Sequence, residues 1–168
     1  MPELTAQERL QPSLLDRLID WQPQQKLEPL EARVLTKQSL RAAVLRDLQW
    51  LFNCEAHGAE FDDGRCPHTG DSVLNFGLPT LSGQFASTVQ GSVIEAGIKR
   101  AILRFEPRIL PKTLEVELVA EQSSLDTHNR VSLMLRGMLW AQPVPIEFLL
   151  RSRIDLEEGR ITVEDLSR

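Results

Sequence analysis

The stretch Arg104-Phe105-Glu106-Pro107-Arg108 lies where the apolar pattern of the chain changes from helical to extended spacing. Pro107 lacks an amide hydrogen and biases Glu106 away from helical backbone angles, so the preceding helix must end here. The corner leaves a carboxylate on Glu106 and a guanidinium on Arg108, two residues apart. Such a pair can anchor a loop or receive the polar groups of a partner. No second acid, histidine or nucleophile lies nearby in the sequence to suggest catalysis.

An apolar stripe of helical spacing precedes the corner, and alternating patterns follow it. The stripe, which a capping box at Ser87 and Gln90 would open, predicts a helix. Its apolar residues are Ile94, Ile98, Ala101, Ile102 and Phe105. After the corner the period shortens to two, which predicts three strands. Their apolar residues are Leu114, Val116 and Leu118; Val131, Leu133, Leu135 and Leu139; and Ile146, Phe148, Leu150 and Ile154. Turns are expected at 126–129 and 142–145, and a short last strand at 160–163.

Two further helices are expected nearer the N-terminus. Ser13 is a suitable N-cap for a short helix over 14–19, whose Leu14, Leu15 and Leu18 would share one face. So short a helix needs a surface to lie against, in its own domain or in a partner. A second helix is expected over 39–53. Its apolar face carries Leu40, Val44, Leu48, Leu51 and Phe52, and its opposite face carries Arg41, Arg46 and Gln49.

These patterns predict an α+β fold in which N-terminal helices pack on a C-terminal antiparallel β-meander. Residues 1–30 are expected to form a tail that contains the short docking helix, and residues 31–168 a single domain. Residues 54–86 contain so many glycines and prolines that long regular elements are not expected there. A loop of that length inside a compact domain usually has a function or is mobile.

The bulk composition excludes several classes of protein. The net charge of −5 argues against a general nucleic-acid or anionic-membrane binder. No apolar run approaches the ~18 residues needed to cross a bilayer, so direct membrane insertion is not expected. The N-terminus has no pattern of a signal peptide, and two cysteines do not make a disulfide framework. A cytoplasmic location is therefore expected.

Four side chains in the irregular segment have the chemistry of zinc ligands: Cys54, His57, Cys66 and His68. Their spacing, C-x2-H-x8-C-x-H, matches no standard zinc finger, and the last pair is tight for two ligands of one ion. Unliganded thiols and imidazoles in a loop are the competing interpretation, which we favour. No metal or other cofactor is expected.

Enzymatic chemistry finds little support in the sequence. A glycosidase needs two carboxylates on either side of the scissile bond, one of them protonated, and a cation such as Arg108 beside Glu106 favours the charged form instead. Neither a G-x-S-x-G elbow nor a phosphate-binding glycine motif occurs. On the predicted sheet, Arg136, Arg151 and Arg153 with Trp140 are either a solvated surface or a protein-docking surface.

Four blocks of the chain together resemble the TssE family, whose members are baseplate subunits of type VI secretion systems. The TssE family is similar to the wedge proteins of contractile phage tails, which were once labelled lysozyme-related. The blocks are Ser13-Leu14-Leu15-Asp16-Arg17-Leu18, Arg46-Asp47-Leu48-Gln49-Trp50-Leu51-Phe52-Asn53, Val73-Leu74-Asn75-Phe76-Gly77-Leu78-Pro79 and Phe105-Glu106-Pro107-Arg108-Ile109. The segment between Asn53 and Val73 departs from the family, because it is longer and richer in Cys and His than expected.

The resemblance implies a small α+β protein with no enzymatic role, recruited to the inner membrane-associated secretion complex. It implies contact with the helical core bundle of the neighbouring baseplate wedge subunits and with strands of the contractile sheath proteins. It also implicates Glu106, Pro107 and Arg108 in the wedge contact. We add Leu14, Leu15 and Leu18 as a second docking element, and we expect an edge of the meander to pair with a sheath strand. Two alternatives remain: a peptidoglycan-cleaving, lysozyme-like enzyme, and a soluble adaptor of the same fold.

Overall fold

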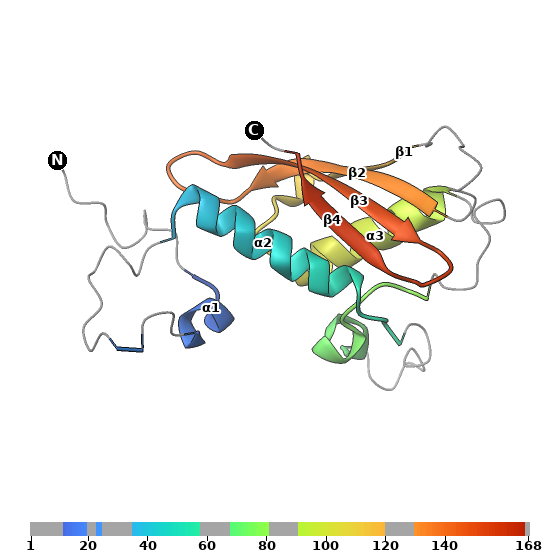
Figure 1. Cartoon of the computed structure of the whole chain (residues 1–168), viewed down its shortest axis with the longest axis horizontal. Coiled ribbons are helices and arrows are strands. Elements are labelled where there is room, and N and C mark those ends of the chain that lie inside the picture. The colour runs from blue at the N-terminus through green and yellow to red at the C-terminus, as the bar shows by residue number, and fades with distance from the viewer. Residues whose placement is uncertain are drawn as a thin grey trace.

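A computed structural model describes residues 12–19, 23–24, 35–57, 68–80, 91–119 and 130–166. Within them the chain forms a four-stranded antiparallel sheet with helices on one face (Figure 1). The α+β prediction is therefore confirmed. The capping box at Ser87 and Gln90, the turn at 126–129 and the expected boundary near residue 30 lie outside the described residues.

The sheet has the strand order β1-β2-β3-β4, so each strand pairs with its neighbour in the sequence. The strands are β1 (Glu115–Val119), β2 (Arg130–Leu139), β3 (Ile146–Asp155) and β4 (Ile161–Asp165). The register places Leu135 opposite both Val116 and Leu150, so the apolar sides of the strands coincide. The predicted turn at 142–145 joins β2 to β3, and the expected last strand is present as β4. The meander is thus confirmed as the alternating pattern predicted it.

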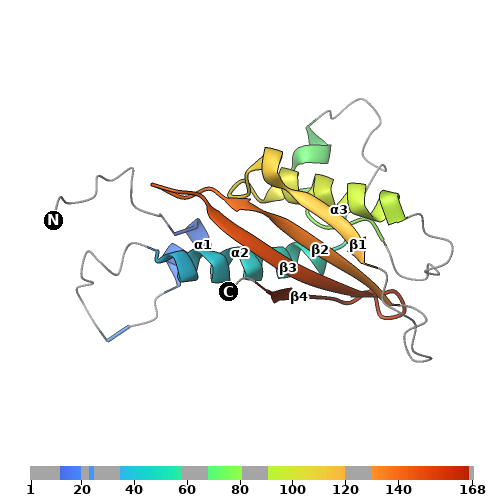
Figure 2. The same ribbon diagram turned by 90° about the horizontal axis from the view of Figure 1, so that it is seen from above.

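Two long helices cover one face of this sheet (Figure 2). Helix α2 (Lys37–Phe52) packs beside β4, and helix α3 (Gly91–Phe105) packs beside β1. Helix α2 begins two residues earlier than the sequence predicts, because Thr36 is its N-cap: the Thr36 hydroxyl accepts a hydrogen bond from the Ser39 amide at 3.0 Å. No helix in the described part of the chain is both long enough and apolar enough to cross a bilayer.

The core lies between the two layers. Nearly all apolar positions predicted from spacing are buried: Leu40, Val44, Leu48, Leu51, Phe52, Ile94, Ile98, Ala101, Ile102, Leu114, Leu133, Leu135, Leu139, Ile146, Phe148, Leu150 and Ile154. Phe105, Val116 and Val131 pack against this core while remaining partly accessible. Leu118, near the open end of β1, is an exception and is exposed. Ser132, which alternates with the apolar residues of β2, is also buried, so the outward side of β2 is not uniformly solvated.

The polar side of α2 also differs from a simple solvated face. Gln49 and Asn53 bind backbone groups of β4, and Arg41 donates to the carbonyl of Glu147. Contacts across more than a hundred residues of sequence leave no local pattern, so spacing alone did not show them. This side of α2 therefore helps to hold the sheet on the helix.

The remaining described elements are short. Helix α1 (Leu14–Leu18) is capped by Ser13 as predicted and contains no buried residue. The irregular segment contains two single turns of 3-10 helix, η3 (Thr69–Asp71) and η4 (Val73–Asn75), and a third, η5 (Pro111–Thr113), precedes β1. Gly77, with a φ of +139°, lets the chain after η4 lie directly against Cys54, where any Cβ would meet the Cys54 carbonyl. This places η4 next to the end of α2.

Candidate functional site

The corner after α3 has the geometry that its sequence predicts. Helix α3 ends at Phe105, and the Glu106 amide still donates to the Ile102 carbonyl at 2.8 Å. Pro107 is exposed, whereas Glu106 is only 4% exposed. The Ile109 amide donates back to the Glu106 carbonyl, which closes the turn toward the sheet. The corner is therefore rigid, but it directs its carboxylate inward.

Glu106 and Arg108 bind each other. The Glu106 carboxylate accepts from Arg108 Nε at 2.6 Å and Nη2 at 2.5 Å, and also from the Arg108 backbone amide at 3.2 Å. The Arg108 side chain is 21% exposed. A two-point guanidinium–carboxylate pair of this kind is among the stronger and more directional contacts in proteins. Hence Glu106 fixes the orientation of Arg108, and Arg108 is the member of the pair that solvent reaches.

This pair is the end of a longer series of alternating charges that joins α1, α2 and the corner. Arg108 Nη2 lies 2.5 Å from Asp47, Asp47 lies 2.8 Å from Arg46, and Arg46 Nη1 lies 2.5 Å from Asp16 in α1. We call the five side chains Asp16, Arg46, Asp47, Arg108 and Glu106 the charge ladder. It brings together the two regions that the sequence predicts as separate docking elements.

The charges of the ladder stabilise one another. The hydrogen bond from Arg46 lowers the pKa of Asp16, and the same bond raises the pKa of Arg46. Burial of Arg108 opposes its charge, but the hydrogen bonds and charges of Glu106 and Asp47 outweigh burial and raise its pKa. Arg108 Nη1 is buried without an acceptor among the residues described. The hydrogen bonds of the ladder therefore favour the charged forms of Asp16, Arg46 and Arg108.

A groove of about 540 Å³ opens beside the ladder, and we call it the corner groove. Its lining residues are Ser13, Asp47, Leu48, Trp50, Leu51, Phe76, Phe105, Glu106, Pro107 and Arg108. Phe76 and Phe105 meet edge to face, with ring centroids 5.3 Å apart. The guanidinium of Arg46 lies over the Trp50 ring, 5.1 Å from its centroid. An apolar aromatic floor with a fixed charge at its rim is the composition of a protein-docking site.

The leucines of α1 extend this apolar surface. Leu14 and Leu18 are 72% and 73% exposed and Leu15 is 39% exposed, while Ser13 lines the corner groove itself. The only ion pair that holds α1 to the described remainder of the chain is Asp16–Arg46. The structure therefore places the predicted residues Leu14, Leu15 and Leu18 on the surface, next to the corner with Glu106, Pro107 and Arg108.

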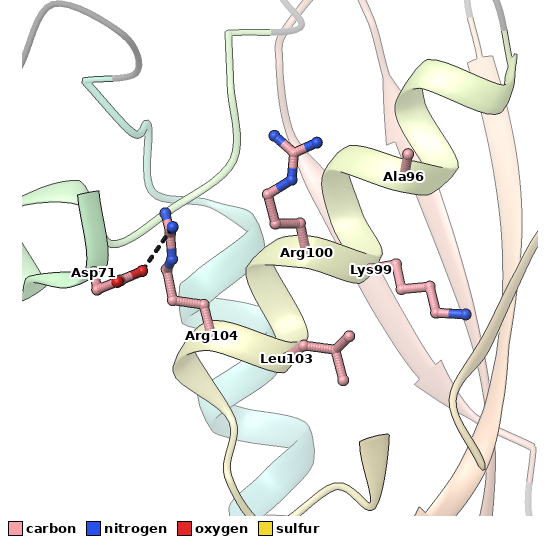
Figure 3. Close-up of a pocket in the computed structure, with 6 residues that line it drawn as sticks. All are labelled: Asp71, Ala96, Lys99, Arg100, Leu103 and Arg104. Carbon is pink, nitrogen blue, oxygen red and sulfur yellow. Dashed lines mark ion pairs between the residues drawn. The ribbon is translucent and has the colours of Figure 1, made fainter. Parts of the chain in front are cut away.

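A second hollow, of about 580 Å³, lies along α3 (Figure 3). Arg104 Nη2 pairs with Asp71 at 2.6 Å and so ties η3 to α3. Figure 3 shows the Lys99 side chain directed away from that pair. Within the part of the chain that the structure describes, the lining of this hollow has no pair of carboxylates and no nucleophile beside a base.

The zinc candidates do not converge in the described ranges. Cys54 is exposed and has a free thiol, and His57 and His68 are also exposed. Among the described residues, no group of three or more His, Cys, Asp and Glu side chains is placed to hold a metal ion. Cys66 lies outside those residues.

The sequence did not indicate three members of the ladder or the aromatic floor of the groove. Asp16, Arg46 and Asp47 stand inside the quoted sequence blocks, but nothing in their spacing pairs them with residue 108. A usable signal was present in Arg46-Asp47. An Arg–Asp pair next to apolar Leu48 marks a boundary between core and surface, where an additional charge from a distant segment is readily accommodated.

Comparison with known protein families gives a match over the middle of the chain. The family model described as "Baseplate wedge protein gp25" matches residues 38–144, which is more than half of the chain. The range contains most of α2, all of α3, the corner and β2, and it excludes α1. No curated protein and no solved structure matches the chain.

Proposed function

This chain belongs to the baseplate wedge protein gp25 family, which includes TssE, and on that premise we propose that it is a non-enzymatic structural subunit of a type VI secretion baseplate. The family establishes a structural role in a phage-tail-like baseplate. Our proposal adds the partners: the subunit docks on the helical core bundle of the neighbouring wedge subunits and connects that bundle to the contractile sheath. It acts in the cytoplasm, at the inner membrane-associated complex.

The observation that carries the docking proposal is the corner groove with the charge ladder at its rim. The groove is large enough to receive several side chains of a helix, and its floor is aromatic. An amphipathic helix lying in such a groove would bury apolar side chains against Phe76 and Phe105 and direct a polar group to Arg108. A bundle of helices offers faces of this kind.

Each residue of the predicted site then has a distinct role. Arg108, whose side chain is 21% exposed, would donate to a carboxylate or carbonyl of the wedge. Glu106 would not contact the wedge itself, because its carboxylate already accepts hydrogen bonds from Arg108; its role would be to hold the Arg108 guanidinium in place. Pro107, exposed at the rim, keeps the turn from fraying. A charge-assisted hydrogen bond in a water-excluded contact contributes about 1.5–3 kcal/mol.

Helix α1 would provide the second contact. Leu14 and Leu18 contribute little to the stability of the monomer in their exposed positions, so the apolar face that they form is available to a partner. Each leucine that becomes fully buried in a complex would stabilise it by about 1.5–3 kcal/mol. This contact requires α1 to stay beside the groove, which the Asp16–Arg46 pair achieves.

A binding experiment with exposed residues tests the docking proposal without disturbing the fold. We expect the variant Leu14→Ser/Leu18→Ser to keep the wild-type thermal stability but to bind the purified wedge subunits at least about tenfold more weakly, which corresponds to 1.4 kcal/mol. Val93→Ser is a matched control, because Val93 is a similarly exposed apolar residue near the start of α3.

Three outcomes would contradict parts of this proposal. Wedge binding that is the same for the double variant and the control would remove α1 from the interface. Release of soluble fragments from peptidoglycan by the purified chain would favour the lysozyme-like enzyme. A chain that captures no wedge or sheath subunit at all would favour a free adaptor.

A further inference from the structure

The hollow of about 580 Å³ in Figure 3 lies on the outward side of α3. Among the described residues, its lining comes from α3 and from Asp71 of η3 alone. Helix α3 buries Ile94, Ile98 and Ile102 in the core, so the fold uses the opposite side of the helix. The side chains that line the hollow are therefore available for contact with another molecule.

The lining side chains of α3 form two rows. Ala96, Arg100 and Arg104 follow one another at intervals of four residues, and so do Lys99 and Leu103. Figure 3 shows Arg100 and Arg104 extending to one side of α3, and Lys99 and Leu103 extending to the other. Rows of this interval are ridges on a helix, and the groove between two ridges accepts a ridge of a second helix. The shape of this surface thus suits a helix lying along α3.

The hollow has a surplus of positive charge, although the whole chain carries a net charge of −5. Its lining contains the cations of Lys99, Arg100 and Arg104 and a single carboxylate, that of Asp71. Asp71 Oδ1 lies 2.6 Å from Arg104 Nη2, which shows that a carboxylate fits against this side of α3. In the described ranges neither Lys99 nor Arg100 has a carboxylate partner. Two exposed cations therefore remain for the acidic groups of a partner.

Apolar surface lies beside these cations, and it discriminates among acidic partners. Leu103 is 39% exposed next to Lys99, and Ala96 is exposed in the row of Arg100. Phosphate-rich surfaces of nucleic acids and membranes are disfavoured, because the Asp71 carboxylate stands at the rim and the cations of the lining are few. A protein segment offers both carboxylates and the apolar side chains that would cover Leu103.

We propose that the outward side of α3 binds a short, acidic, amphipathic helix of a partner protein. An apolar row of that helix covers Leu103, and carboxylates on its two flanks pair with Arg100 on one side and Lys99 on the other. Exposed ion pairs contribute little singly, so the apolar row supplies affinity and the charges supply selectivity. This contact is separate from the corner groove and does not depend on docking to the wedge.

A designed helical peptide tests the proposal. The acidic peptide carries a row of leucines flanked by glutamates, and the control peptide has glutamine in place of every glutamate. Titration with the acidic peptide should shift the NMR signals of the lining residues of α3. The glutamine peptide should bind at least about fivefold more weakly, because it forms no ion pairs. The difference should shrink as salt is added, because exposed charges are screened.

Charge reversal locates the contact. The variant Lys99→Glu/Arg100→Glu should bind the acidic peptide at least about fivefold more weakly than wild type. The matched control Lys37→Glu/Lys112→Glu has the same net charge and should stay within about twofold of wild type. All four side chains are exposed, so both variants should fold. Lys99→Gln/Arg100→Gln is the milder replacement if a thermal melt shows that the reversal unfolds the chain.

Several results would overturn the inference. They are absence of binding by the acidic peptide, equal binding of the two peptides, and equal weakening by the two double variants. Tighter binding of duplex DNA or of phosphatidylglycerol vesicles than of the acidic peptide at the same salt would assign the hollow to another class of partner.

The corner groove provides the test of separateness. Leu14→Ser/Leu18→Ser should leave binding of the acidic peptide unchanged, and Lys99→Glu/Arg100→Glu should leave binding of the wedge subunits unchanged. Loss of peptide binding in the leucine variant would place the peptide at α1 and refute the site on α3. Loss of wedge binding in that variant alone would concern only the proposed function.

Discussion

The substitution Arg108→Ala tests the reasoning about the corner most directly. It removes both side-chain donors of the Glu106 carboxylate, whose side chain is only 5% exposed. Removing one partner of a buried ion pair typically costs 3–5 kcal/mol, because the other charge is left without compensation. Water can enter from the corner groove, so we expect the lower end, about 3 kcal/mol. For a chain of this size that corresponds to a fall in Tm of about 6–12 °C.

Thermal and chemical denaturation of a small set of variants would measure this effect. Arg100→Ala, an arginine on the exposed side of α3, should change the free energy of unfolding by less than about 0.5 kcal/mol. The double variant Glu106→Leu/Arg108→Met replaces both charges by apolar groups and should recover more than half of the loss. Asp47 keeps Arg46 as its partner in all of these variants.

Two results would refute the account of the corner. A Tm of Arg108→Ala within about 2 °C of wild type would mean that Glu106 is not held in a buried, charged state. A double variant as unstable as the single one would mean that packing, rather than the unpaired carboxylate, causes the loss. In either case the description of Glu106 as the support of Arg108 would have to be abandoned.

Three further predictions concern single features. Because the hydrogen bond from Arg46 lowers the pKa of Asp16 below its ordinary 3.8, the stabilisation by this pair is complete above that pH and is lost as the pH falls through the lower pKa of the folded state. The NMR chemical shifts of α1 should therefore change on acidification. In the variant Asp16→Asn, the α1 shifts at neutral pH should already resemble those of the acidified wild type. Identical spectra of wild type and variant at neutral pH would contradict the role of this ion pair. Gly77→Ala places a Cβ 2.5 Å from the Cys54 carbonyl oxygen, at a φ of +139°. Chemical denaturation should therefore show a free energy of unfolding lower by about 1–3 kcal/mol. An unchanged denaturation midpoint would exclude backbone strain at this position. Thr36→Ala should lower the stability by about 1 kcal/mol through loss of the N-cap, whereas Thr36→Ser should lie close to wild type in the same thermal melt; equal losses in the two variants would argue against the cap.

The periodicity of the sequence was enough for the fold. Alternation around Leu133 and Leu135 and helical spacing around Ile98 and Ile102 each identified the buried side, because burial imposes the period of the backbone on the residue types. The end of α3 was equally predictable, since Pro107 acts on the residue next to it. These effects act between residues close in sequence, so a single sequence is enough to predict them.

The arrangement of the site was less accessible. The sequence indicated the corner and the leucines of α1, but it did not show that Glu106 is buried or that Arg46 and Asp47 join the two regions. Both properties depend on how α2 lies beside the corner, across about sixty residues of chain. The same holds for Gln49 and Asn53, which resemble ordinary polar residues of a helix until β4 is placed next to them.

The charge ladder has a consequence for the order of assembly. Its two ends lie in the two regions proposed to meet the wedge, and Arg46 and Asp47 are shared between them. A ligand that shifts Arg108 therefore changes the electrostatic environment of Asp16, and by thermodynamic reciprocity a ligand that captures α1 changes the affinity of the corner by the same factor. Binding at one end of the ladder would therefore alter the affinity at the other end, so the two contacts with the wedge would be coupled.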